Sequence, residues 1–321
     1  RNLICRTMAS AREAAFDREK SDGFIGKEEG EATRLAKFQE MLQAEESYVD
    51  IVQLREASRS GIPEKFRGEV WKNLLGIYPS MESKDRIEDT KTQTSVEYDP
   101  ELAKEITEEA TSFLERHPSV KKKTSLGRLV RLVGSVIHSR PKIQYRPGLV
   151  HMVGSVVAAV DHWVDTPNVF LRIYDLKTTY MGSHSIGEEL AQLLALVRRF
   201  LPSLRRVLIN EDLSPNRWAL PWIQNLLSDS LPLSCTLRLW DAYLSESDGW
   251  KLHKFVCLAI LATLEEEMQE MDREELHCFL RHLPALDVEL LILRAKNMQE
   301  GEAANATSML DRKAISNPSL L

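Results

Sequence analysis

The strongest periodic pattern in the sequence lies in residues 149–164, directly after the segment 145–148. Apolar side chains recur there at steps of three and one positions, which places them along one side of a helix. The stretch is shorter than the roughly 20 apolar residues that a membrane span needs, and it contains His151, Asp161 and His162. It therefore predicts a buried helix, which other helices must cover.

Other parts of the chain repeat this pattern, so the sequence predicts an all-α, multi-helix body. The 14 glycines and 13 prolines in 321 residues are too few for the many turns of a sandwich or barrel. Asp99-Pro100 and Ser185 with Glu188 have the form of helix starts. Further helices are expected at residues 64–76, 100–114, 125–140, 185–200, 218–227, 234–244, 252–268, 273–283 and 287–298.

Composition along the chain predicts four regions. Residues 1–30 are polar and are expected to be loosely ordered, and residues 31–58 are expected to form one amphipathic helix. The main domain is expected to cover residues 59–299 and to be followed by a polar tail at 300–321.

Charge and motifs exclude several classes of function. The net charge of −6 is opposite to that of a nucleic-acid-binding domain, and the Lys121-Lys122-Lys123 run is interpreted as a solvated loop. The sequence has no nucleotide-binding or hydrolase motif, and His277 and His282 do not have metal-ligand spacing, so we expect neither a cofactor nor a metal. Without a signal-peptide pattern or a membrane span, the expected location is the cytoplasm.

Four stretches, in order, resemble the TBC domain, the GTPase-activating domain that acts on Rab-type small GTPases. They are RSGIPEKFRGEVWKNLLG (59–76), YRPGL with the apolar helix after it (145–149 onward), FLPSL with WALPWIQNLLSDSLPLSCTLRLWDAYL (200–204 and 218–244), and the predicted helix at 252–268. Within them Arg67, Trp71, Trp240 and Asp241 are expected to be structural, with Asp241 beside an arginine.

The resemblance implies an all-helical TBC fold and a mechanism based on two inserted side chains. An arginine from an IxxDxxR motif neutralises the transferring phosphoryl group, and the glutamine of YxQG orients the attacking water. In this sequence the aspartate position is Glu109, the arginine position is Ser112 and the glutamine position is Pro147. Neither Ser112 nor Pro147 can replace the side chain that the pattern requires.

These departures predict a catalytically inactive pseudo-GAP, not an enzyme, that serves as a binding module or scaffold in vesicle trafficking. Its partner would be a Rab-like GTPase or another protein, and any membrane association would be peripheral and through that partner. Two alternatives stay open: an active protein that uses Arg116 and Gln144 as substitutes, and a structural subunit without a GTPase partner. The candidate interface residues are Glu109, Ser112, Tyr145, Arg146, Pro147 and Gly148.

Overall fold

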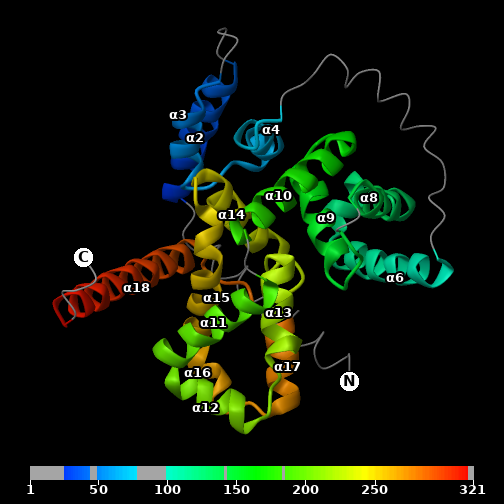
Figure 1. The fold of residues 1–321 in the computed structure, drawn as a ribbon. Coiled ribbons are helices and arrows are strands. Elements are labelled where there is room, and N and C mark those ends of the chain that lie inside the picture. The colour runs from blue at the N-terminus through cyan, green and yellow to red at the C-terminus, as the bar shows by residue number, and fades with distance from the viewer. Residues whose placement is uncertain (1–24, 44–48, 78–98, 141–142, 183–184, 317–321) are drawn as a thin grey trace.

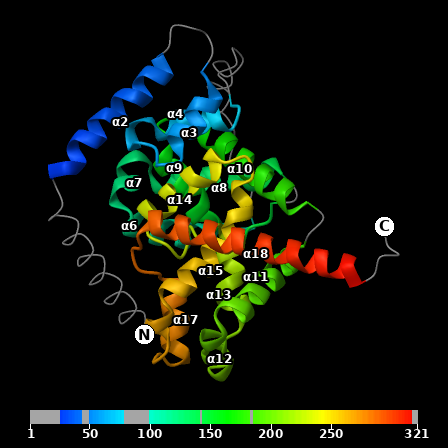
Figure 2. The ribbon, with the colours of Figure 1, turned by 90° about the vertical axis from the view of Figure 1, so that its left-hand side faces the viewer.

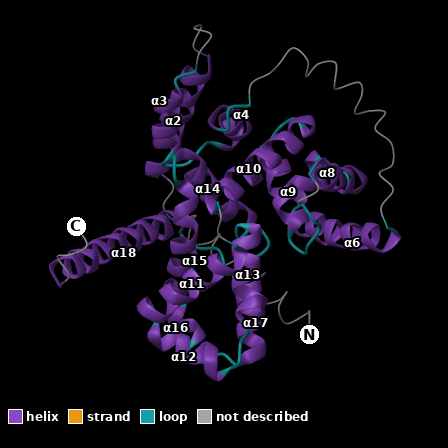
Figure 3. Cartoon of the chain, viewed as in Figure 1, coloured by secondary structure: helices purple, strands orange, loops and turns teal. Residues whose placement is uncertain are grey.

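The computed structural model describes residues 25–43, 49–77, 99–140, 143–182 and 185–316 (Figure 1). These residues form α-helices and short 3-10 helices joined by loops, and none of them lies in a strand (Figure 3). The expected all-α class is therefore confirmed.

The helices of the described residues follow one another along the chain with short connections. Their bounds are α2 Ile25–Gln43, α3 Ile51–Ser58, α4 Glu64–Leu74, α6 Pro100–Arg116, α7 Pro118–Lys123, α8 Leu126–Ser139, α9 Leu149–Ala159, η2 Trp163–Asp165, α10 Thr166–Met181, α11 Ile186–Phe200, α12 Pro202–Asn210, α13 Pro215–Asn225, α14 Leu233–Ser245, η3 Gly249–Leu252, α15 His253–Thr263, α16 Glu265–Met268, α17 Arg273–Arg281 and α18 Val288–Ser316.

Helix α9 is the centre of the first half of the molecule. It contacts α6, α7, α8 and α10, and nearly every one of its side chains is buried. This explains why residues 149–159 are apolar almost throughout, because a helix covered on all sides has no polar face. Ala159 is the last residue of α9, so the predicted helix ends earlier than residue 164.

The second half is built from α11, α12, α13, α15, α16 and α17, which lie together at one end of the molecule (Figure 1). Helix α14 contacts α4 and α9, and it also contacts α18, which packs on α15 of the second half. Helix α18 leaves the body along α15 and projects outward (Figure 2). The contact of α9 with α13 brings the loop before α9 to the border between the halves.

Several helix starts have the caps that the sequence predicts. The Asp99 side chain accepts a hydrogen bond from the Glu101 amide, with Pro100 in the first turn of α6. Ser185 and Glu188 form the expected capping box of α11. Such caps satisfy amide groups that have no partner within the helix.

The prediction of one helix over residues 31–58 is wrong. Two helices, α2 and α3, occupy this region, and Asp50 starts the second of them. Asp50 has an extended backbone, and its carboxylate accepts hydrogen bonds from the amides of Val52 and Gln53. An aspartate that caps a helix in this way cannot also continue the preceding one.

Other boundaries also differ from the prediction. Of the segment 1–30, residues 1–24 lie outside the described part of the chain, and α2 begins at Ile25. At the other end α18 continues through residues 300–316, which the sequence indicates only as a polar tail. The Lys121-Lys122-Lys123 run is the last turn of α7 and not a loop.

Helices α10 and α12 are absent from the set predicted from the sequence. Each has a proline in its first turn, and α10 buries Val169, Phe170 and Ile173 against the first half. Among the described residues, no helix is both long enough and apolar enough to cross a membrane.

Candidate functional site

Glu109 on α6 joins this helix to the loop that precedes α9. Its Oε2 accepts a hydrogen bond of 2.6 Å from the Tyr145 hydroxyl. Its Oε1 accepts one of 2.8 Å from the backbone amide of Gly148. One carboxylate therefore holds both ends of the Tyr145–Gly148 segment, which we call the α9 loop.

The electrostatics of this contact keep the proton on Tyr145. Burial raises the pKa of Tyr145, and the neighbouring Glu109 carboxylate raises it further. Burial also raises the pKa of Glu109, although the hydrogen bonds from Tyr145 and Gly148 oppose that shift. Tyr145 thus stays a hydrogen-bond donor, and the Glu109 carboxyl oxygen accepts from it.

The tight turn of the α9 loop depends on Gly148. Its φ of +95° lies in the region that favours glycine. A Cβ at this position would lie 1.9 Å from Asn225 Nδ2, which itself donates a 3.0 Å hydrogen bond to the Pro147 carbonyl. The fully buried Asn225 therefore holds the Pro147–Gly148 end of the α9 loop against α13. No sequence pattern indicates this role for Asn225.

Arg146 points from the α9 loop toward α13. Its Nε donates to Asn225 Oδ1 over 3.3 Å and its Nη2 to the Gln224 carbonyl over 3.0 Å. The same carbonyl accepts a 2.6 Å hydrogen bond from Nζ of Lys177 on α10. Arg146 is thus tied into the protein, although the sequence places it among the candidate interface residues.

The residues at the two expected finger positions belong to the two elements that Glu109 joins, α6 and the α9 loop. Ser112 is partly buried on α6, three residues after Glu109, and Pro147 is an exposed residue of the α9 loop. Gln144 is exposed as well. The side chains of Ser112 and Pro147 carry no charge and no amide group.

Arg116, the possible substitute, is directed at α9. Its Nη2 lies 2.9 Å from Nε2 of His151. Burial and the charge of Arg116 lower the pKa of His151 well below its usual value, so the ring is neutral at pH 7. Because arginine only donates, Nε2 of the neutral ring is the acceptor in this pair.

The four residues expected to be structural meet where α4 contacts α14. Asp241 is fully buried and accepts hydrogen bonds from Trp71 Nε1 at 2.7 Å and Arg67 Nε at 3.1 Å. The indole rings of Trp71 and Trp240 lie 6.0 Å apart, and Trp240 Nε1 donates to the Leu226 carbonyl. Arg67 is therefore the arginine that the sequence predicts beside Asp241.

The comparison with known families identifies this arrangement of helices. The family model of the Rab-GTPase-TBC domain matches residues 64–269, which is more than half of the chain. The chain belongs to this family. The resemblance seen in the sequence is thus confirmed, and the matched segment contains both the Glu109 contact and the Asp241 cluster.

Related proteins support the TBC assignment. The chain is 28% identical to TBC1 domain family member 22A of Macaca fascicularis over 84% of its own length and 63% of that protein. It is 23% identical to the GTPase-activating protein gyp1 of Schizosaccharomyces pombe over 85% of its length and 63% of that protein. The chain thus spans less than two thirds of these relatives.

Solved TBC structures share the fold. The Ypt/Rab-GAP domain of Gyp1p matches with a TM-score of 0.63 and 20% identity, over 84% of this chain and 98% of that one. The Chlamydomonas flagellar RabGAP TBC domain also gives a TM-score of 0.63, with 22% identity over 82% of this chain and 90% of that one. At these identities the likeness shows the all-helical fold alone.

Proposed function

We propose that this TBC domain is a pseudo-GAP, which binds a Rab-like GTPase without accelerating GTP hydrolysis. The observation that carries the proposal is the contact of Glu109 with Tyr145 and Gly148. It supports the alignment in which Glu109 takes the aspartate position of IxxDxxR, Ser112 takes the arginine position and Pro147 the glutamine position.

The missing guanidinium is the larger of the two losses. An arginine finger contributes about 10³ to 10⁵ in rate because its delocalised charge stabilises the transferring phosphoryl group. The Ser112 hydroxyl has neither that charge nor that reach. Pro147 has no side-chain polar atom that could hold the attacking water, so both parts of the mechanism are removed.

A binding role is compatible with the contacts that this chain keeps. Glu109 and Asn225 hold the α9 loop in a defined conformation, and its exposed residues Gln144 and Pro147 remain available to a partner. A Rab-like partner would place the protein, as a cytoplasmic scaffold, at the vesicle membranes to which that partner is attached.

The first alternative is an active TBC domain in which Arg116 and Gln144 substitute for the two fingers. The contact between Arg116 and His151 weighs against it, because Arg116 would have to leave His151 to reach a bound nucleotide. The second alternative, a structural subunit without a GTPase partner, differs from our proposal in predicting no nucleotide-dependent binding.

The test measures GTP hydrolysis by a panel of Rab-family GTPases in the presence of the native chain and of the double variant Ser112→Arg/Pro147→Gln. We expect no stimulation by the native chain and stimulation of at least one GTPase by the variant. Ser139→Arg/Pro202→Gln is the matched control, because it adds the same side chains at exposed positions on α8 and α12.

A binding measurement completes the test. The native chain should bind the GTPase that the variant activates, and more tightly in its GTP-analogue form than in its GDP form. Stimulation by the native chain would contradict the proposal, and Arg116→Ala would then show whether Arg116 is the substitute. Absence of binding across the panel would instead favour the structural subunit.

A further inference from the structure

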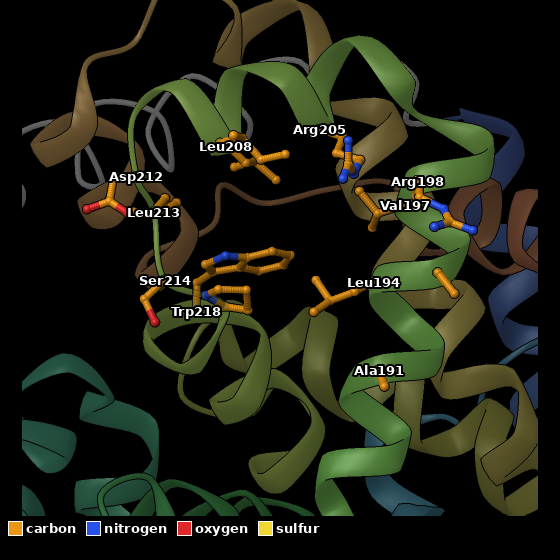
Figure 4. Close-up of a pocket in the computed structure, with 13 residues that line it drawn as sticks. Ala191, Leu194, Val197, Arg198, Arg205, Leu208, Asp212, Leu213, Ser214 and Trp218 are labelled. Atoms are coloured by element: carbon orange, nitrogen blue, oxygen red, sulfur yellow. The ribbon is translucent and has the colours of Figure 1, made fainter.

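A pocket of about 710 Å³ opens between α11, α12 and the start of α13 (Figure 4). It lies in the second half of the molecule, and none of its lining residues belongs to α6 or the α9 loop. Its walls are apolar and include Leu194, Val197, Leu208 and Leu213. Ile209, at its edge, is 56% exposed. The pocket therefore offers apolar surface that the fold itself does not cover.

Trp218 contributes a buried donor without a partner. Its indole lies in the pocket between Leu208 and Leu194 (Figure 4) and is 1% exposed. Within the described part of the chain, its Nε1 has no hydrogen-bond partner. The indoles of Trp71, Trp222 and Trp240 all donate to oxygen atoms. Because this atom is itself buried, a ligand in the pocket would meet carbon atoms of the indole and not its donor, so Trp218 adds to the apolar wall.

Two arginines give the pocket a positive mouth. Arg198 on α11 and Arg205 on α12 are both exposed lining residues (Figure 4). Neither makes a side-chain hydrogen bond or an ion pair with another residue that the structure describes. Asp212 is the acidic lining residue, and its Oδ2 lies 3.4 Å from Arg273 Nη2. The pocket thus joins apolar walls to two cationic side chains at its mouth.

We propose that this pocket binds a single-chain amphiphilic anion, an alkyl carboxylate or alkyl phosphate. The alkyl chain would cover Leu194, Val197 and Leu208, and the head group would accept hydrogen bonds from Arg198 and Arg205. Its volume lies within the roughly 300–1,000 Å³ typical of small-molecule sites, and helices bound it on three sides. The apolar lining matches the alkyl chain of such a ligand, and the two arginines at the mouth match its anionic head group.

The test titrates the full chain with sodium laurate below its micelle concentration, by isothermal calorimetry. Dodecyl phosphate distinguishes a phosphate from a carboxylate head group, and dodecanol reports binding by the alkyl chain alone. We expect saturable binding of one laurate or one dodecyl phosphate per chain, and weaker binding of dodecanol. No saturable binding of either anion would overturn the proposal.

Variants separate the two parts of the site. Arg198→Gln/Arg205→Gln should weaken laurate binding at least about tenfold, because charge-assisted hydrogen bonds are lost, and should leave dodecanol binding unchanged. Ala195→Trp, at an exposed lining position, should fill the pocket and abolish both. Arg206→Gln is the matched control, since Arg206 is exposed on α12 and is not a lining residue.

Two results would contradict this assignment even if laurate binds. Equal affinity of the Arg198→Gln/Arg205→Gln variant and the native chain would show that these arginines do not hold the head group. Unchanged affinity in Ala195→Trp would place the ligand elsewhere. If an acidic peptide with a tryptophan anchor displaces no laurate, the small ligand is supported, and complete displacement at a lower concentration would make the pocket a peptide site.

Discussion

At the scale of single residues, Asp241 joins α14 to α4 and to the residues before α4. It is fully buried and accepts hydrogen bonds from the Ile62 amide, the Arg67 guanidinium and the Trp71 indole. Burial raises the pKa of Asp241, and the charge of Arg67 opposes that shift. The carboxylate is therefore tolerated in the core because three donors surround it.

Asp241→Asn should lower the free energy of unfolding by about 3–5 kcal/mol, because it leaves the positive charge of Arg67 buried without its partner. Arg67 is only 13% exposed at its side chain. Urea denaturation measures the change. The control is Asp248→Asn, whose ion pair with Lys251 is exposed and should contribute at most about 1 kcal/mol. Equal effects of the two variants would contradict the central role of Asp241.

Gly148 is the second residue whose substitution has a specific consequence. A Cβ there would collide with the Asn225 amide, and alanine is strained at a φ of +95°. We expect Gly148→Ala to cost about 1–3 kcal/mol and to displace the α9 loop. Chemical denaturation measures the cost. Gly76→Ala, also at positive φ but with no atom within 4 Å of the added Cβ, isolates the part due to the collision.

At the scale of elements, the sequence predicts helices better than it predicts where they break or touch. Apolar periods reveal α6, α8, α9 and α11, and caps add to the signal at α6 and α11. Asp50 is not recognised as a break, since an aspartate between two apolar periods is also compatible with one continuous helix. Helix α10 is missed because its apolar side chains are fewer and are separated by polar ones.

At the candidate site, too, the sequence predicts some residues and not the contacts that hold them. Glu109, Tyr145 and Gly148 follow from the TBC resemblance, because they belong to short motifs. Asn225, which holds the α9 loop, and Lys177, which donates to the Gln224 carbonyl, come from elements distant in sequence, and no pattern predicts these contacts. Periodicity can show that such a residue is on a buried face, but not which carbonyl or amide it will meet.

Lys177 makes the contact between α10 and α13 depend on pH. Burial lowers its pKa to about 7, and Arg146 contributes to the lowering while Glu189 opposes it. The unfolded chain retains this proton to about pH 10.5, so between pH 7 and 10 the unfolded state binds more protons. The contribution of Lys177 to folding stability should therefore become more favourable as the pH rises through this window.

Comparison with Lys177→Met isolates that contribution. The Gln224 carbonyl keeps its hydrogen bond from Arg146 in this variant. The stability of the variant relative to the native chain should fall by up to about 1.4 kcal/mol per pH unit between pH 7.5 and 9.5. Urea titrations at several pH values measure it. The exposed Lys122→Met should give a constant difference, and a constant difference for Lys177→Met would show that this lysine stays charged in the fold.

At the scale of the whole molecule, the folded unit is larger than the segment that defines the family. The TBC match begins at residue 64, yet α3 precedes it and packs on α14. Leu54 of α3 is fully buried, and the Arg55 guanidinium donates to the Leu244 carbonyl. Past residue 269, α18 packs on α15 and buries Leu291.

If α3 is part of the cooperative unit, then a cavity in it must destabilise the whole domain. Leu54→Ala should lower the free energy of unfolding by about 2–5 kcal/mol, the usual cost of truncating a buried leucine. Val52→Ala, on the same helix at a position 77% exposed, should change it by less than about 0.5 kcal/mol.

Urea unfolding should be followed by both circular dichroism and tryptophan fluorescence, because all six tryptophans lie outside α3. A loss reported equally by the two probes means that α3 and the TBC core unfold together. A Leu54→Ala variant whose fluorescence transition matches that of the native chain would mean that α3 unfolds on its own.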